Sequence, residues 1–175
     1  DSGTVVDLGI MYGDLPEGVF LSKWVSEKYG IKSLSDLNNP DFAKLVDGDG
    51  DGIGDLYGCD PGWACAAKND KLITAYGLDK LYKQVVGSTH LLKAAAVGRI
   101  LSKKPVLMYN FYPNDIFIDY PMGKDFVYLE EPQKFYNKSY VPKLANKKWV
   151  DANPKAAQLV RQINITGEDV MSWMK

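Results

Sequence analysis

Histidine and cysteine are scarce in this sequence. It has one histidine, His90, and two cysteines, Cys59 and Cys65. These three residues cannot make a zinc site of four Cys or His ligands. A Ser-His-Asp triad would need His90 as its base, yet residues 88–93 have the pattern of a helix start, and no Gly-x-Ser-x-Gly element occurs. We therefore expect a structural role for His90 and a protein that is not an enzyme.

The chain also lacks an excess of positive charge and a long apolar run. Its 21 Lys and Arg residues are matched by 22 Asp and Glu residues, so nucleic-acid binding is not expected. The apolar runs at residues 93–98 and 106–109 are far too short to span a membrane. Residues 1–6 have neither a basic region nor a long apolar stretch, so we expect any export signal to be absent from this chain.

What the sequence does have is the composition of one folded domain, or of one lobe of a two-lobed protein. Of its 175 residues, 46% are hydrophobic and 25% are charged. Strand-like runs at residues 19–21, 82–86, 106–109 and 126–129 alternate with helix-like runs at residues 23–29, 33–46, 66–76 and 89–102. Gly30 is well placed to end the first helix, and the second run is broken around residues 38–40, where Pro40 fits a helix N-terminus. This alternation predicts an α/β fold. In the helix at 89–102 we expect five residues to be available for burial: Leu91, Leu92, Ala95, Ile100 and Leu101.

Both ends of the chain have apolar segments that need a partner. Residues 4–9 resemble a strand, residues 141–145 resemble another, and Asn153-Pro154 predicts a helix start. Thr166 and Asp169 have the spacing of a capping box, which predicts a last helix. Its apolar side chains belong to Val170, Met171, Trp173 and Met174. We expect these side chains to face water and the protein to self-associate through its edges.

An acidic, glycine-rich run matches the first part of a calcium loop. The carboxylates at relative positions 1, 3, 5 and 9 belong to Asp47, Asp49, Asp51 and Asp55. Gly52 stands at position 6, and the carbonyl of Ile53 would be the ligand at position 7. Position 12 is Gly58, where a calcium loop has Glu. The run is equally typical of successive Asx-turns with glycines at positive φ, so a structural calcium ion and a metal-free turn are both open.

The segment between the two cysteines combines a turn, an aromatic ring and a helix start. Asp60-Pro-Gly62 predicts the turn, Trp63 follows it, and a helix is expected from about Ala64. Free N–H groups at a helix start attract a carboxylate, and an aromatic face binds a cation. The segment can therefore hold a zwitterion. Its alternative is a core tryptophan between two buried thiols, and the residues alone leave both possibilities open.

Several motifs occur together in the order seen in one family. They are residues 29–34, 37–45, 49–52, 55–65, 104–109, 123–128 and 144–147, and the pair 153–154. With them, the chain resembles the substrate-binding proteins of ABC transporters for glycine betaine and related quaternary amines. The most specific motif is Gly-Cys-Asp-Pro-Gly-Trp-Ala-Cys, at residues 58–65.

The resemblance implies the type II periplasmic-binding-protein fold, in which two α/β lobes are joined by crossing strands. The expected lobe has three layers and a mixed, mostly parallel sheet. Residues 1–15 would be a crossing strand, 16–132 the ligand-binding lobe, and 133–175 a return segment towards a first lobe that this chain lacks. The implied setting is the periplasm or cell surface, with a transporter permease as partner and no required cofactor beyond a possible structural calcium ion.

The resemblance also implies a ligand site and a disulfide. A quaternary ammonium has no N–H to donate, so aromatic faces must recognise it. Trp63 matches one tryptophan of the family's aromatic box, and Phe111 stands where a second is expected, with Tyr112 able to compensate. The N–H groups of Ala64 and Cys65 match the carboxylate contacts. The family's carboxylate-binding histidine lies in the segment that this chain lacks, so His90 does not correspond to it. Export implies a disulfide between Cys59 and Cys65.

Two other functions are weighed against solute binding. Phe111 and the missing lobe are also consistent with a reduced, calcium-stabilised interaction module that no longer binds ligand. A redox enzyme would use Cys59 and Cys65, but their spacing differs from the Cys-x-x-Cys of thiol oxidoreductases. The resemblance therefore favours the solute-binding lobe, without specifying which quaternary amine it takes.

Overall fold

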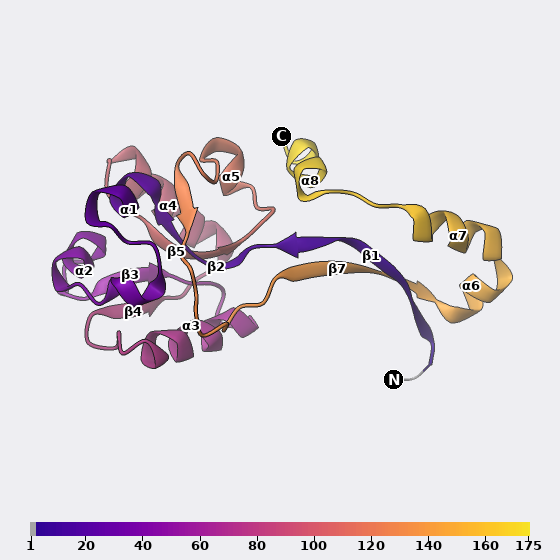
Figure 1. The fold of residues 1–175 in the computed structure, drawn as a ribbon, viewed down its shortest axis with the longest axis horizontal. Helices are drawn as coiled ribbons and strands as arrows, with labels where there is room; N and C mark the ends of the chain where they lie inside the picture. Colours follow the sequence, from indigo (N-terminus) through magenta and orange to yellow (C-terminus); the bar gives the residue numbers. More distant parts are fainter. Residues whose placement is uncertain (1–2) are drawn as a thin grey trace.

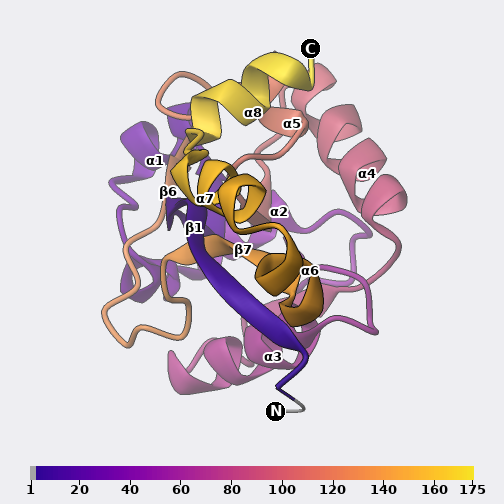
Figure 2. The ribbon, with the colours of Figure 1, turned by 90° about the vertical axis from the view of Figure 1, so that its right-hand side faces the viewer.

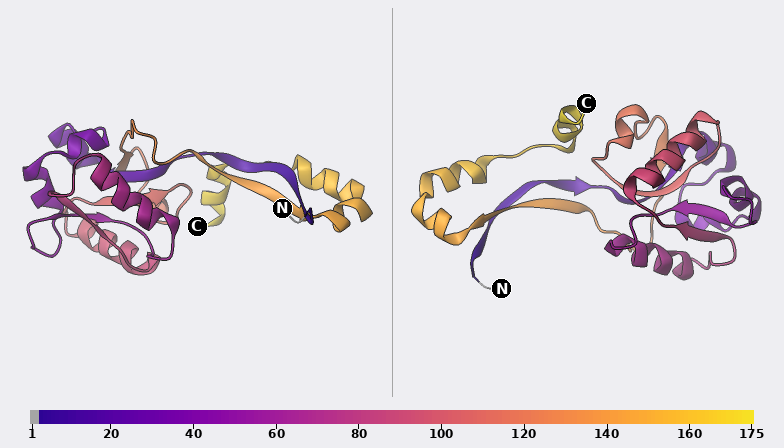
Figure 3. Two further views of the ribbon diagram at one scale, coloured as in Figure 1. Left: turned by 90° about the horizontal axis from the view of Figure 1, so that it is seen from below. Right: turned by 180° about the vertical axis from the view of Figure 1, so that it is seen from behind.

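The computed structural model describes residues 3–175, apart from the side chains of Asp14 and Ser139. It consists of an α/β lobe and a long arm (Figure 1). The lobe contains a five-stranded sheet and the helices that pack on it. The arm is a two-stranded ribbon with helices at its far end, from which the chain returns to the lobe (Figure 3).

A five-stranded sheet forms the centre of the lobe. Its spatial order is β4 (Tyr82–Val85), β3 (Gly54–Tyr57), β5 (Leu107–Phe111), β2 (Glu17–Ser22) and β6 (Phe126–Tyr128). Strand β3 is parallel to β4 and to β5, whereas β2 is antiparallel to β5 and to β6. Only β2 therefore runs against the other strands of this sheet. The mixed, mostly parallel sheet predicted from the resemblance is confirmed.

Helices cover both faces of the sheet. The helical elements are α1 (Lys23–Tyr29), a 3-10 helix (Leu34–Leu37), α2 (Pro40–Val46), α3 (Ala64–Ala75), α4 (Thr89–Leu101) and α5 (Ile116–Asp119). Val19 and Leu21 of β2 join the core under α1, α2 and α3, whereas Phe20 points into the core under α4 and α5. Successive strand residues alternate between the faces, so one strand serves two cores. The result is the expected three-layer α/β lobe.

Local capping explains where several helices begin and end. The Asn39 side chain accepts hydrogen bonds from the N–H groups of Asp41 and Phe42, and Pro40 occupies the first turn of α2. Ser88 caps α4 in the same way through the N–H of Leu91. Gly30 ends α1 at a φ of 69°, a left-handed conformation that glycine adopts without steric cost. These boundaries agree with the sequence predictions.

Burial along α4 differs from the prediction. Leu92, Ala96 and Arg99 form the buried stripe, while Leu91 and Leu101 are 64% and 74% exposed. Positions 92, 96 and 99 recur with the helical period and face the sheet, and positions 91 and 101 fall outside that stripe. The predicted burial of Leu91 and Leu101 was therefore wrong. The buried stripe of α4 is hard to recognise from the sequence because one of its positions is occupied by a charged residue, Arg99.

The arm pairs segments from opposite ends of the chain. Strand β1 (Val5–Leu15) runs antiparallel to β7 (Ser139–Asn146), with Val5 opposite Asn146 and Tyr12 opposite Val141. At its far end lie α6 (Lys147–Ala152) and α7 (Pro154–Gln162) (Figure 2). The predicted domain boundaries after residues 15 and 132 stay a prediction, although β1 ends and β2 begins near the first of them.

The last helix, α8 (Gly167–Trp173), returns to the lobe. Thr166 and Asp169 form the expected capping box. Met171 is buried in the second core with Ile116 and Phe117 of α5, so its predicted exposure was wrong. Val170 is half-buried, whereas Trp173 and Met174 are exposed, as predicted. A helix can bury only the stripe that faces its neighbour, and Met171 lies on that stripe.

Candidate ligand-binding site

A hollow opens at the carboxyl edge of the sheet. Strands β3 and β5 are parallel and end side by side, so the loops that follow them meet there. In open α/β sheets, ligands bind outside this edge. The lining residues come from the end of β3 and the loop after it, from α4 and β5, and from the start of α5 and the loop before it: Tyr57, Gly58, Cys59, Trp63, Thr89, Leu92, Lys93, Ala96, Met108, Tyr109, Asn110, Phe111, Asn114, Asp115 and Ile116.

The Cys59–Cys65 segment presents Trp63 to this hollow. Both cysteines are buried and their Sγ atoms form a disulfide, 2.07 Å apart. Within the bridged loop, Asp60 accepts hydrogen bonds from the N–H groups of Gly62 and Trp63, which makes the predicted turn. Trp63 itself is 49% exposed. The alternative of a core tryptophan between free thiols was therefore wrong.

The disulfide leads to a stability prediction. Bridging a loop this short stabilises the native state by about 2 kcal/mol in the chain-entropy model. We expect the double variant Cys59→Ser/Cys65→Ser to lose about this much free energy of unfolding in a urea titration. Reducing agent should lower the midpoint of the wild type and leave the double variant unchanged. Two free thiols in a mass spectrum of the unreduced wild type would contradict the prediction.

Helix α3 begins directly after Trp63 and leaves N–H donors available. Trp63 is its N-cap residue and makes no side-chain cap, and its carbonyl accepts from the N–H of Ala66. Within residues 3–175, no acceptor is found for the N–H groups of Ala64 and Cys65. Because α3 is 12 residues long, these donors stand at the positive end of a full helix dipole. They can donate hydrogen bonds to a carboxylate.

The structure brings Phe111 to Trp63 and places Tyr112 elsewhere. Phe111, at the end of β5, is half-buried and lines the same hollow as Trp63. The N–H of Tyr112 donates to the carbonyl of Pro16, and its ring packs near Phe117, with ring centroids 6.2 Å apart. Tyr112 thus lines a separate hollow between the lobe and α8. Alternation along the extended chain turns residues 111 and 112 to opposite sides.

The hollow also contains polar residues that the sequence did not indicate. Lys93 Nζ lies 2.7 Å from Asp115 Oδ2, and both residues line the hollow, so their charges offset each other. Tyr109 donates its hydroxyl hydrogen to Glu17, at 2.8 Å. Burial and the nearby Glu17 charge raise the pKa of Tyr109, which keeps its hydroxyl protonated. Only the position of these residues near the ends of α4 and β5 could have indicated them.

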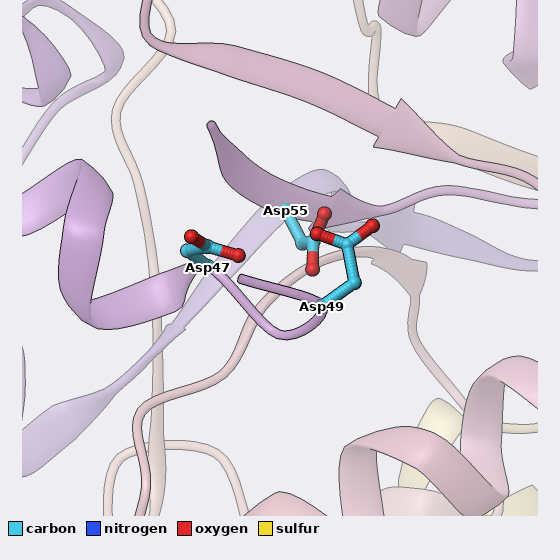
Figure 4. A group of neighbouring side chains, drawn as sticks. All are labelled: Asp47, Asp49 and Asp55. Carbon is cyan, nitrogen blue, oxygen red and sulfur yellow. The ribbon is translucent and has the colours of Figure 1, made fainter. Parts of the chain in front are cut away.

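The acidic run folds into a tight loop beside β3. Asp47 accepts hydrogen bonds from the N–H groups of Gly50 and Gly52, whose φ angles are 82° and 90°. Asp49 and Asp51 each accept from the N–H two residues ahead. The prediction of successive Asx-turns with glycines at positive φ is confirmed. Oxygens of Asp47, Asp49 and Asp55 converge within 4.8 Å of one another, while Asp51 is outside this group (Figure 4).

The mixed sheet with helices on both faces, the two-stranded ribbon and a hollow at the carboxyl edge match the fold of periplasmic binding proteins. The chain belongs to the family of substrate-binding domains of ABC-type glycine betaine transport systems (OpuAC), whose model matches residues 1–175. This is a family of solute-binding proteins of transporters and not of enzymes, in agreement with the sequence analysis. Within residues 3–175, no helix is long and apolar enough to cross a membrane.

Curated relatives are glycine betaine-binding periplasmic proteins. The glycine betaine/proline betaine-binding periplasmic protein of Escherichia coli K12 is 29% identical over 180 residues, covering 93% of this chain and 54% of the relative. The glycine betaine-binding periplasmic protein OusX of Dickeya dadantii is 29% identical over 184 residues, with the same coverage. This chain therefore spans about half the length of the relatives it matches.

Solved structures share the fold. The glycine betaine/L-proline-binding protein ProX of Borrelia burgdorferi superposes with a TM-score of 0.72 at 19% identity, over 98% of this chain and 59% of that one. Lactococcal OpuAC in its closed form with glycine betaine gives a TM-score of 0.72 at 20% identity, over 97% of this chain and 60% of that one.

Proposed function

We propose that this chain is the solute-binding lobe of an ABC importer for glycine betaine or a related quaternary amine. The observation that carries the proposal is the half-exposed Trp63, which lines a hollow with Phe111 next to the N–H groups of Ala64 and Cys65, for which the described part of the chain offers no acceptor. An exposed tryptophan at the carboxyl edge of a sheet is free to contact a ligand. The names of the relatives support the same solute class.

The proposed binding mode assigns each half of the zwitterion to one kind of group. The trimethylammonium lies against the faces of Trp63 and Phe111, because π electrons attract a cation that cannot donate a hydrogen bond. The carboxylate accepts hydrogen bonds from Ala64 and Cys65 at the start of α3. The Lys93–Asp115 pair leaves the hollow close to neutral, which suits a ligand without net charge.

Partners and location follow from the proposed role. The full transport function requires a permease of the ABC transporter and a complete binding cleft. Since the curated relatives are periplasmic, we propose the periplasm or the cell surface for this protein as well.

Calorimetric titration of the chain with glycine betaine, proline betaine and choline tests the proposal. Each aromatic face contributes roughly 0.5–2 kcal/mol and the charge-assisted hydrogen bonds about 1–3 kcal/mol, and open solvent favours the lower values. After the cost of association, we expect a dissociation constant of about 1 mM or weaker. Both betaines should bind more tightly than choline, which has no carboxylate. Equal binding of choline would contradict the proposed carboxylate contacts. Micromolar binding of a betaine would contradict a site whose aromatic faces and hydrogen bonds are open to solvent.

The arm favours a second function, association through apolar surface. Exposed apolar side chains lie along β7, α7 and α8: Tyr140, Leu144, Leu159 and Trp173. We expect the isolated chain to self-associate, because contiguous exposed apolar surface usually finds a partner. Sedimentation velocity over a range of protein concentrations measures this. A sedimentation coefficient that keeps the value of the monomer at high protein concentration would contradict the prediction.

A further inference from the structure

The acidic loop presents several carboxylate oxygens to one small volume. Asp47 lies at the end of α2, Asp49 in the loop and Asp55 in β3, and Figure 4 shows their carboxylates gathered around the turn. Their closest oxygens lie within 4.8 Å of one another. Oxygens bound to one calcium ion at 2.3–2.6 Å can be at most about 5 Å apart. The three side chains can therefore bind the same ion.

Asp55 gives this cluster a feature that the turn alone does not explain. The residue is 3% exposed, yet its Oδ1 accepts no hydrogen bond within the described part of the chain. Its other oxygen accepts from the N–H of Gly48, which orients the carboxylate into the cluster. A buried carboxylate oxygen without a hydrogen-bond donor is costly, so the position calls for a cation.

One side-chain cation already approaches the cluster from β4. Lys83 Nζ lies 2.6 Å from Asp49, 2.5 Å from Asp51 and 3.7 Å from Asp55. Arg99 also lies near the loop, where it donates to the carbonyls of Leu45 and Asp47. Four carboxylates and these two cations leave two negative charges unbalanced, which is the charge of one divalent ion.

We propose that residues 47–55 form a calcium site whose buried ligand is Asp55, and that Lys83 competes with the metal for this site. Calcium is preferred because it accepts irregular sets of oxygen ligands, whereas magnesium demands near-ideal octahedral geometry and gives up its waters reluctantly. The metal would join α2, the loop and β3, so its role is structural. This site is separate from the aromatic hollow, and its test needs no betaine.

Calorimetry and thermal unfolding of the EDTA-treated chain with calcium chloride alone test the proposal. At ten times the dissociation constant, we expect calcium to raise the Tm by about 3–6 °C. Asp55→Asn keeps the side-chain shape and should abolish both the heat of calcium binding and the calcium-induced rise in Tm. Asp41→Asn, on the exposed side of α2, is the matched control and should behave as the wild type. Lys83→Met should bind calcium about tenfold more tightly, since the metal then displaces no ammonium.

The outcomes separate clearly. If neither the wild type nor Lys83→Met shows a heat of calcium binding, the proposed site is wrong. Because Lys83→Met removes no ligand, this outcome tests the site even if Asp55→Asn fails to fold. Undiminished calcium binding by a folded Asp55→Asn would overturn its assignment as ligand. An equal response to magnesium chloride would overturn the calcium preference, and unchanged affinity in Lys83→Met would overturn the competition.

Discussion

Replacing Trp63 with alanine is expected to abolish measurable binding of glycine betaine. The indole of Trp63 is larger than the ring of Phe111, which lines the same hollow, and tryptophan is the strongest cation–π partner among the side chains. Removing it costs about 1–2 kcal/mol, a factor of about 5–30 in affinity, from binding that is already weak. Titration calorimetry at millimolar ligand measures the loss. Because Trp63 is half-exposed, the variant should keep the stability of the wild type.

A matched control and a reciprocal variant make this test specific. Trp24 is 46% exposed on α1 and lines a different hollow, so Trp24→Ala should bind as the wild type does. Phe111→Trp should strengthen binding about two- to fivefold, because a larger aromatic face attracts the ammonium more strongly. Retained binding by Trp63→Ala, or an equal loss in Trp24→Ala, would remove the basis for the proposed site.

Phe42→Ala is expected to lower the free energy of unfolding by about 3–5 kcal/mol. Phe42 of α2 is completely buried, and its ring lies between Tyr29 and Tyr82, with centroids 6.2 Å and 6.5 Å away. Its removal leaves a cavity that α2 and β4 can fill only in part, so lost contacts add to the lost transfer energy. Urea unfolding followed by circular dichroism measures the change.

The control for this core prediction is Leu91→Ala in α4. Leu91 is 64% exposed, so its truncation should change the free energy of unfolding by less than about 0.5 kcal/mol. Comparable losses in Leu91→Ala and Phe42→Ala would contradict the assignment of the two positions to surface and core. The comparison also checks the face of α4 on which the hydrophobic pattern was misleading.

Local structure was readable from the sequence because its causes are local. The Asn39-Pro40 start of α2, the left-handed Gly30, the capping box at Thr166 and the Asx-turns at residues 47–53 depend on contacts within a few residues. The alternation of strands and helices was enough to predict the α/β class. The motifs taken together, of which the one at residues 58–65 is the most specific, were enough to indicate the family.

The tertiary structure alone decided which distant residues meet. Trp63 and Phe111 share a hollow because β3 and β5 are parallel neighbours, and Tyr112 leaves it because the chain alternates at that point. Lys83 reaches the acidic loop because β4 pairs with β3. Met171 is buried because α8 returns to the lobe. Pairings across 30 to 150 residues depend on the packing of the whole core, and no short sequence pattern encodes them.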